Sequence, residues 1–172
     1  MLEIIRTMQE SGYQPYKTFL FIAYSGEGYE GGLPVSSGNV KRFLDAKYGF
    51  SSAFEIESVV ELRGLGASDG GDLLLASDGN LRLAQLFQSA GRRMGVPARI
   101  IREEIDLSLI FSEGSPLDSG EEAPSVRIFR EGWESTSRIV TDKLDSISVE
   151  KLEEAGRAIS LGLMIIGREI DY

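Results

Sequence analysis

Glycines and glutamates gather directly after an apolar run in "FLFIAYSGEGYEGG", residues 19–32. Gly26, Gly28 and Gly31 have the G-x-G-x-x-G spacing that lets backbone amides approach the pyrophosphate of a dinucleotide. Glu27 and Glu30 oppose that interpretation, because they put two negative charges where phosphates would lie. A dinucleotide-binding domain is therefore the weaker alternative for this stretch.

Histidine and cysteine are both missing from the 172 residues. Their absence removes the usual general base, the serine–histidine relay, thiolate chemistry and the commonest transition-metal ligand. Any metal would have to bind carboxylates and carbonyls, which suits magnesium or calcium better than zinc. Asp69 and Asp72 in "GASDGGD" (66–72) could hold calcium in this way, but we favour a hairpin turn there.

Composition and charge limit the class of protein. With 42% hydrophobic and 26% charged residues, the chain is expected to fold, and its length fits a single domain over residues 1–172. A net charge of −9 argues against binding to nucleic acid or to anionic membranes. No stretch reaches the roughly 18 apolar residues of a membrane span, so no membrane insertion is expected in this segment. The start reads as a helix and not as a signal peptide, and nothing indicates a compartment.

The pattern of apolar residues predicts helices alternating with strands. Helices are expected over 1–11, 40–47 and from Asp78 or Asn80 to Met94, and strands over 18–24, 54–62, 73–76, 98–101 and 125–129, with 107–111 ambiguous. The first helix should turn Leu2, Ile5 and Met8 inward, and the third Leu83, Leu86, Phe87, Ala90 and Met94. This alternation predicts an α/β fold with a mixed, mostly parallel sheet flanked by helices.

The last helix has the clearest signals. Ser148 is the expected N-cap, and Glu150 in the first turn favours the helix dipole. Apolar residues then recur at helical spacing: Val149, Leu152, Ala155, Ile159, Leu163 and Ile166. Its late "LGLMIIG" is a candidate partner surface, because a sheet lacking strands would expose an edge.

From "YKTFLFIAYSGEG" to its end, the chain resembles the C-terminal part of the two-zinc aminopeptidase family. That family includes bacterial leucyl aminopeptidases, aminopeptidase Y and the ectodomain of the transferrin receptor. "FIAYSGEG" resembles its strand bearing paired glutamates, and "VVELRGLG" (59–66) resembles its strand bearing an aspartate ligand. "RIVTDKLDSISVEKLEEAGRAI" (138–159) is similar to the segment after its last histidine. The resemblance implies a three-layer zinc-exopeptidase fold that is truncated at its N-terminus.

The residues at the family's functional positions differ from the family pattern. The resemblance puts the general base at Glu27, but a second glutamate ligand falls on Gly28, an aspartate ligand on Arg63 and a histidine ligand on Arg138. A guanidinium is permanently charged and cannot ligate zinc. Without zinc, water keeps its bulk pKa, so Glu27 has nothing acidic enough to deprotonate. We expect a vestigial pocket with no cofactor, although the family uses two zinc ions.

A non-catalytic binding or assembly module is therefore the favoured function. The alternative is a portion of a zinc aminopeptidase that an upstream segment completes. Possible partners are another segment or chain that completes the sheet, or a second copy of this chain. Arg63 and Arg138 are interpreted as surface salt-bridge residues; in the sharper alternative they replace the metal charges, pairing with Glu27 or Asp142. Trp133 could stack on a ligand, though packing is the simpler interpretation.

Overall fold

The computed structural model describes residues 1–23, 57–77, 81–102, 124–133 and 144–169. In chain order the elements are helix α1 (Leu2–Glu10), strands β1 (Val59–Arg63) and β2 (Leu73–Ser77), helix α4 (Leu81–Arg93), strands β3 (Ala98–Arg102) and β4 (Ser125–Arg130), the 3-10 turn η3 (Leu144–Ser146) and helix α5 (Val149–Ile166). Helix and strand alternate as the sequence predicts. The expected helix at 40–47 and the ambiguous segment at 107–111 lie outside the described residues.

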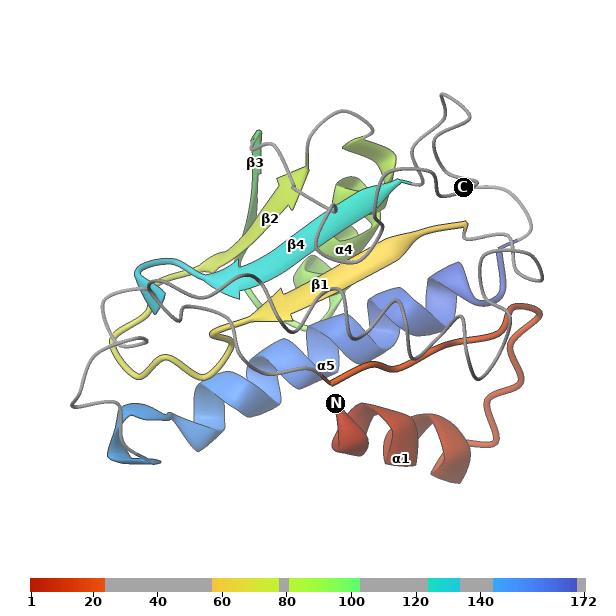
Figure 1. Cartoon of the computed structure of the whole chain (residues 1–172), viewed down its shortest axis with the longest axis horizontal. Helices are drawn as coiled ribbons and strands as arrows, with labels where there is room; N and C mark the ends of the chain where they lie inside the picture. The colour runs from red at the N-terminus through yellow and green to blue at the C-terminus, as the bar shows by residue number, and fades with distance from the viewer. Residues whose placement is uncertain (24–56, 78–80, 103–123, 134–143, 170–172) are drawn as a thin grey trace, which may run out of the picture.

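The four strands form one mixed sheet in the order β1-β4-β2-β3 (Figure 1). β1 runs parallel to β4 and β2 runs parallel to β3, whereas β2 and β4 are antiparallel. Helix α4 connects β2 to β3, which parallel neighbours require because a tight turn cannot join them. The predicted α/β class with a mixed sheet and flanking helices is therefore confirmed.

The main core lies between one face of the sheet and the three described helices. Alternate residues of each strand point to this face, so Leu73 and Leu75 of β2 share it with Val126 and Ile128 of β4. Helix α5 packs against both α4 and α1 (Figure 1). The helices add these buried side chains: Ile4, Met8, Leu83, Ala84, Phe87, Ala155, Ala158, Ile159, Leu163 and Ile166.

The opposite face of the sheet carries a smaller apolar cluster. Leu74 and Ala76 of β2 and Phe129 of β4 are buried there, with Ile101 and Trp133 packed against them. The two central strands, β2 and β4, are thus buried on both faces, which explains why "LLLAS" in β2 reads as a continuous apolar run and does not alternate.

The predicted strand at 18–24 is wrong for residues 18–23, where the structure has extended chain without strand pairing; residue 24 lies outside the described part. Phe19 and Phe21 pack side by side against the main core, with ring centroids 6.0 Å apart. The Tyr16 amide donates to the Gly167 carbonyl at the end of α5, at 2.7 Å. The aromatic residues therefore cover the end of α5. A segment that covers a helix end needs a run of apolar residues, as a buried strand does, so the two have the same sequence pattern.

Several residues expected in the core are exposed. In α1 the buried residues are Ile4 and Met8, and Leu2 faces solvent. Met94 lies just beyond α4 and is also exposed. At the start of α5, Val149 and Leu152 are exposed, because the first turn of that helix extends past the sheet-facing core that begins at Ala155.

The candidate partner surface at the end of α5 is wrong for most of its length. Gly162, Leu163 and Ile166 are buried, and Met164 packs against the main core. None of the helices in the described part of the chain is long and apolar enough to cross a membrane.

Candidate functional site

Of the five residues that the sequence assigns to a vestigial pocket, only Arg63 lies in the described structure. It is the last residue of β1. Glu27, Gly28, Arg138 and Asp142 lie outside the described residues. Their convergence on Arg63 therefore stays a prediction.

Arg63 belongs to a charged cluster on the sheet face that bears the smaller apolar cluster. Glu61 lies two residues earlier on the same strand, and Arg127 of β4 is its direct neighbour in the parallel ladder. Arg63 forms an ion pair with one carboxylate oxygen of Glu61, and Arg127 Nε donates to the other at 2.6 Å. The two arginine side chains are only 15% and 13% exposed, and that of Glu61 is 8% exposed.

Both oxygens of Glu61 are engaged, so its carboxylate is not a vacant metal ligand. Within the described ranges, no group of three carboxylate, histidine or cysteine side chains could hold a metal ion. The interpretation of Arg63 as a salt-bridge residue is confirmed, but the ion pair is nearly buried and does not lie at the surface.

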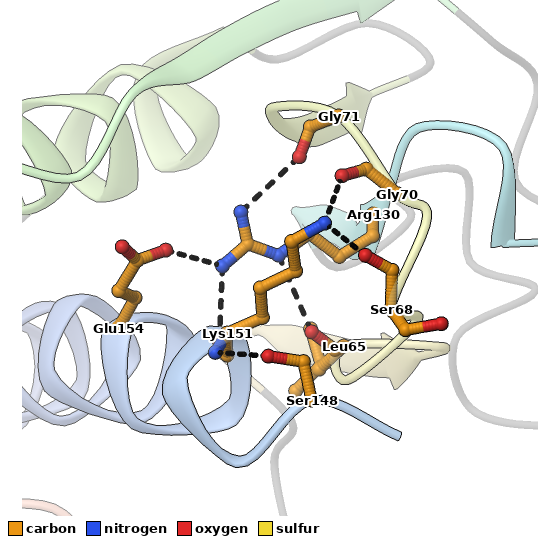
Figure 2. Close-up of polar contacts among 8 residues, drawn as sticks. All are labelled: Leu65, Ser68, Gly70, Gly71, Arg130, Ser148, Lys151 and Glu154. Carbon is orange, nitrogen blue, oxygen red and sulfur yellow. Dashed lines mark hydrogen bonds and ion pairs between the residues drawn. The ribbon is translucent and has the colours of Figure 1, made fainter. Parts of the chain in front are cut away.

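A second polar network joins the turn after β1 to the start of α5 (Figure 2). Buried Arg130, the last residue of β4, donates to the carbonyls of Leu65, Gly71 and Lys151 at 3.3, 3.2 and 2.9 Å. Its guanidinium also pairs with the Glu154 carboxylate at 2.9 Å. One side chain thus ties together β4, the 65–71 turn and the first turns of α5.

Lys151 holds the middle of the same turn. Its ammonium donates to the carbonyls of Ser68 and Gly70, both at 2.5 Å. Its backbone amide donates to the Ser148 hydroxyl at 3.2 Å, which confirms Ser148 as the N-cap. In Figure 2 the turn carbonyls point at the two cationic side chains from one side while α5 supplies Glu154 from the other.

The hairpin predicted at 66–72 is wrong. The turn connects β1 to β2, which are not neighbours, since β4 lies between them. Its glycines instead permit close approach, because a Cβ on Gly70 would lie 2.9 Å from the Arg130 Cβ. Asp72 pairs with Arg99 at 3.5 Å, and two carbonyls of the turn accept from Lys151. The side chains of Lys151 and Arg99 therefore bind the turn that could hold calcium in the alternative interpretation of Asp69 and Asp72.

Trp133 has a packing role, as the simpler interpretation predicts. Gly64 directly follows β1 with φ +48°, and a Cβ there would lie 2.5 Å from the Cβ of Trp133. The indole packs against the smaller apolar cluster. Gly64 thus supplies both the left-handed conformation and the space for the ring.

Sequence reasoning missed Glu61, Arg127, Arg130, Lys151 and Glu154. A signal for the first existed, because Glu61 and Arg63 alternate with Val60 and Leu62 and so share one face of a strand. The partners on β4 and α5 are distant in sequence, and no local pattern could pair them with the turn.

Comparison of the chain with protein-family models, with curated proteins and with solved structures finds no match.

Proposed function

We propose that this chain is a non-catalytic binding or assembly module built on a peptidase-like scaffold. The observation that carries the proposal is the position and pairing of Arg63. It ends β1, where the resemblance to two-zinc aminopeptidases puts an aspartate ligand, and it is paired with Glu61 beside Arg127. A cation paired within the sheet thus replaces a metal-binding anion.

The order of elements supports the scaffold part of the proposal. The resemblance implies an apolar strand before Glu27, a later strand that ends at the ligand position and a long closing helix. β1 and α5 follow the last two in that order, and the sheet is mixed with helices packed on it, whereas residues 18–23 form no strand. These features are consistent with a zinc-exopeptidase-like fold, although other α/β folds also have them.

The charges around Arg63 support the lack of catalysis. Arg63 cannot ligate a divalent cation, and the guanidinium groups of Arg63 and Arg127 already occupy both oxygens of Glu61 at this end of the sheet. Without a bound metal, Glu27 would have only bulk water to activate, and general-base chemistry on such water is slow. Binding is then the activity that a scaffold of this kind retains.

Metal analysis combined with a peptidase assay tests the proposal. We expect purified protein incubated with zinc and then desalted to keep well below one zinc per chain, and to release no product from aminoacyl fluorogenic substrates. Arg63→Asp serves as a comparison, and we expect it to gain no hydrolysis, since Gly28 and Arg138 would still lack ligand groups. Stoichiometric zinc together with zinc-dependent hydrolysis by the unaltered chain would refute the proposal.

A further inference from the structure

Four apolar side chains form an exposed group where the chain enters α5. These residues, which we call the helix-entry patch, are Leu144, Ile147, Val149 and Leu152. Leu144 is 82% exposed and Val149 is 78% exposed. Contiguous exposed apolar side chains are characteristic of interaction surfaces, whereas single ones are ordinary.

Two side chains of the patch meet each other, and the patch rests on a fixed support. A Cβ on Gly66 would lie 2.8 Å from Leu152 Cγ and 3.0 Å from Ile147 Cγ2, so these two side chains meet above that glycine. The Ile147 amide donates to the Leu144 carbonyl at 3.1 Å, and Ala67 and Ile147 form a β-bridge. Lys151 and Arg130 hold the turn beneath, so the patch lies on a preorganised part of the molecule.

Exposed acidic side chains lie next to the patch residues along the chain. Asp145, Glu150 and Glu153 are exposed and alternate with its residues along the chain. Asp69 is exposed on the turn that Ser146 contacts, since the Ser68 amide donates to the Ser146 carbonyl at 3.0 Å. Among the described residues, the basic groups near the patch are Lys151 and Arg157, and Lys143, which precedes Leu144, lies outside the described residues.

The two basic side chains in the first half of α5 are both engaged. Lys151 is directed at the turn carbonyls, away from any incoming ligand. Arg157 lies 4.0 Å from Glu153, one turn further along the helix. An apolar partner approaching the patch therefore meets a negative rim.

This rim discriminates between possible occupants. A second copy of the chain would bring the same acids against themselves, and each copy carries a net charge of −9. An anionic membrane would be repelled for the same reason. We propose that the helix-entry patch docks a basic amphipathic peptide segment of another protein, whose apolar side chains cover the patch while its Lys or Arg residues face the acidic rim. The inference rests on the proposed binding function and deepens it by naming the class of partner.

The probe is a fluorescein-labelled amphipathic peptide of Leu and Lys at helical spacing, titrated with the full chain and followed by fluorescence anisotropy. We expect saturable binding that weakens as salt is added. Leu144→Ser combined with Val149→Ser should weaken it about tenfold or more, because both side chains are exposed and make the apolar contact. Glu150→Gln combined with Glu153→Gln should weaken it about fivefold and reduce its salt dependence.

Leu2→Ser is the matched control, because Leu2 is 79% exposed on α1 and lies outside the patch. It should leave peptide binding unchanged, and circular dichroism checks that every variant folds. Equal binding of a Leu/Glu peptide, or equal effects of Leu2→Ser and the patch variant, would overturn the inference. Patch-dependent dimerisation at low ionic strength, or patch-dependent binding to phosphatidylcholine or phosphatidylserine vesicles, would overturn it too. None of these outcomes alters the zinc and hydrolysis results, so a failure here is distinct from failure of the proposed function.

Discussion

Arg130 is a buried cation whose partners are mostly backbone carbonyls. The carbonyls of Leu65, Gly71 and Lys151 would lack these donors without Arg130, whose own side chain is only 4% exposed. The rigid fork of a guanidinium has five donors and can serve more acceptors than the three donors of an ammonium group can. The residue therefore fixes the conformation of the 65–71 turn as well as neutralising Glu154.

Replacing Arg130 should destabilise the protein strongly. We expect Arg130→Met to lower the free energy of unfolding by about 3 kcal/mol, because it removes the buried member of an ion pair and takes the donor away from three carbonyls. Arg130→Lys should restore only part of the loss. Urea denaturation measures both, and Arg99→Met is the control, since Arg99 pairs with Asp72 and Glu131 at the exposed surface. Equal losses for Arg130→Met and Arg99→Met would contradict the assigned role.

Tyr13 links stability to alkaline pH. Its hydroxyl donates to the Met164 carbonyl at 2.7 Å, and burial raises the pKa of the phenol above its usual value, with nearby Arg168 opposing the shift. A raised pKa in the folded state means that the neutral phenol stabilises the fold below pH about 10, and that this contribution is lost as pH rises through the folded value. The stability difference between the unaltered chain and Tyr13→Phe should therefore shrink above that pH. Urea denaturation at a series of pH values measures it, and a constant difference would contradict the role of burial.

The limits of sequence reasoning at this scale follow from distance along the chain. Arg63 was singled out by a family resemblance, and its partner Glu61 lies only two residues away on the same strand face. Arg127 is 66 residues from Glu61, and only the parallel ladder between β1 and β4 makes them neighbours. The spacing of apolar residues identifies strands but does not show which strands are neighbours in a sheet. The contacts among Glu61, Arg63 and Arg127 could therefore not be predicted before the sheet topology was known.

Helices α4 and α5 approach closely because α5 has a glycine at the contact. A Cβ on Gly162 would overlap the ring of Phe87, which is itself buried in the main core. Gly162→Ala should therefore lower the free energy of unfolding by about 1–3 kcal/mol through overpacking, despite the better helix propensity of alanine. Gly156 is the matched control in the same helix, since no heavy atom lies within 4 Å of its Cβ position.

Gly156→Ala should raise the free energy of unfolding by about 0.5–1 kcal/mol, because alanine restricts the unfolded chain and nothing obstructs its methyl group. Thermal and urea denaturation of the two variants should thus give changes of opposite sign. If Gly162→Ala also raised the free energy of unfolding, the α4–α5 contact would not depend on the absence of a side chain at Gly162.

The spacing of apolar residues predicted most of the helices and strands, because the apolar face of each is the face that packs on the core. β2, α4, β3, β4 and α5 all lie close to their expected bounds, since each buries the face that its pattern marks. The failures occur where an apolar run has another partner. Residues 18–23 pack on the end of α5 without joining the described sheet, and Val149 and Leu152 keep the helical period beyond the region where a sheet lies beneath them.

For the whole molecule, charge opposes the association that the apolar patch favours. The net charge of −9 keeps copies apart, and it does so most effectively when little salt is present. The helix-entry patch adds a short-range attraction that salt does not weaken. These two contributions should separate when the ionic strength is varied.

Light scattering can measure them through the osmotic second virial coefficient. At low salt we expect the unaltered chain and the Leu144→Ser, Val149→Ser variant to repel equally, because net charge is the same in both. Near 1 M salt the screening length falls to about 3 Å. The unaltered chain should then have the lower coefficient, because its patch is exposed and its repulsion is removed. A difference between the two coefficients already at low salt would mean that attraction between patches is stronger than the repulsion between the acidic rims. Equal coefficients at high salt would mean that the helix-entry patch does not attract other copies of the chain.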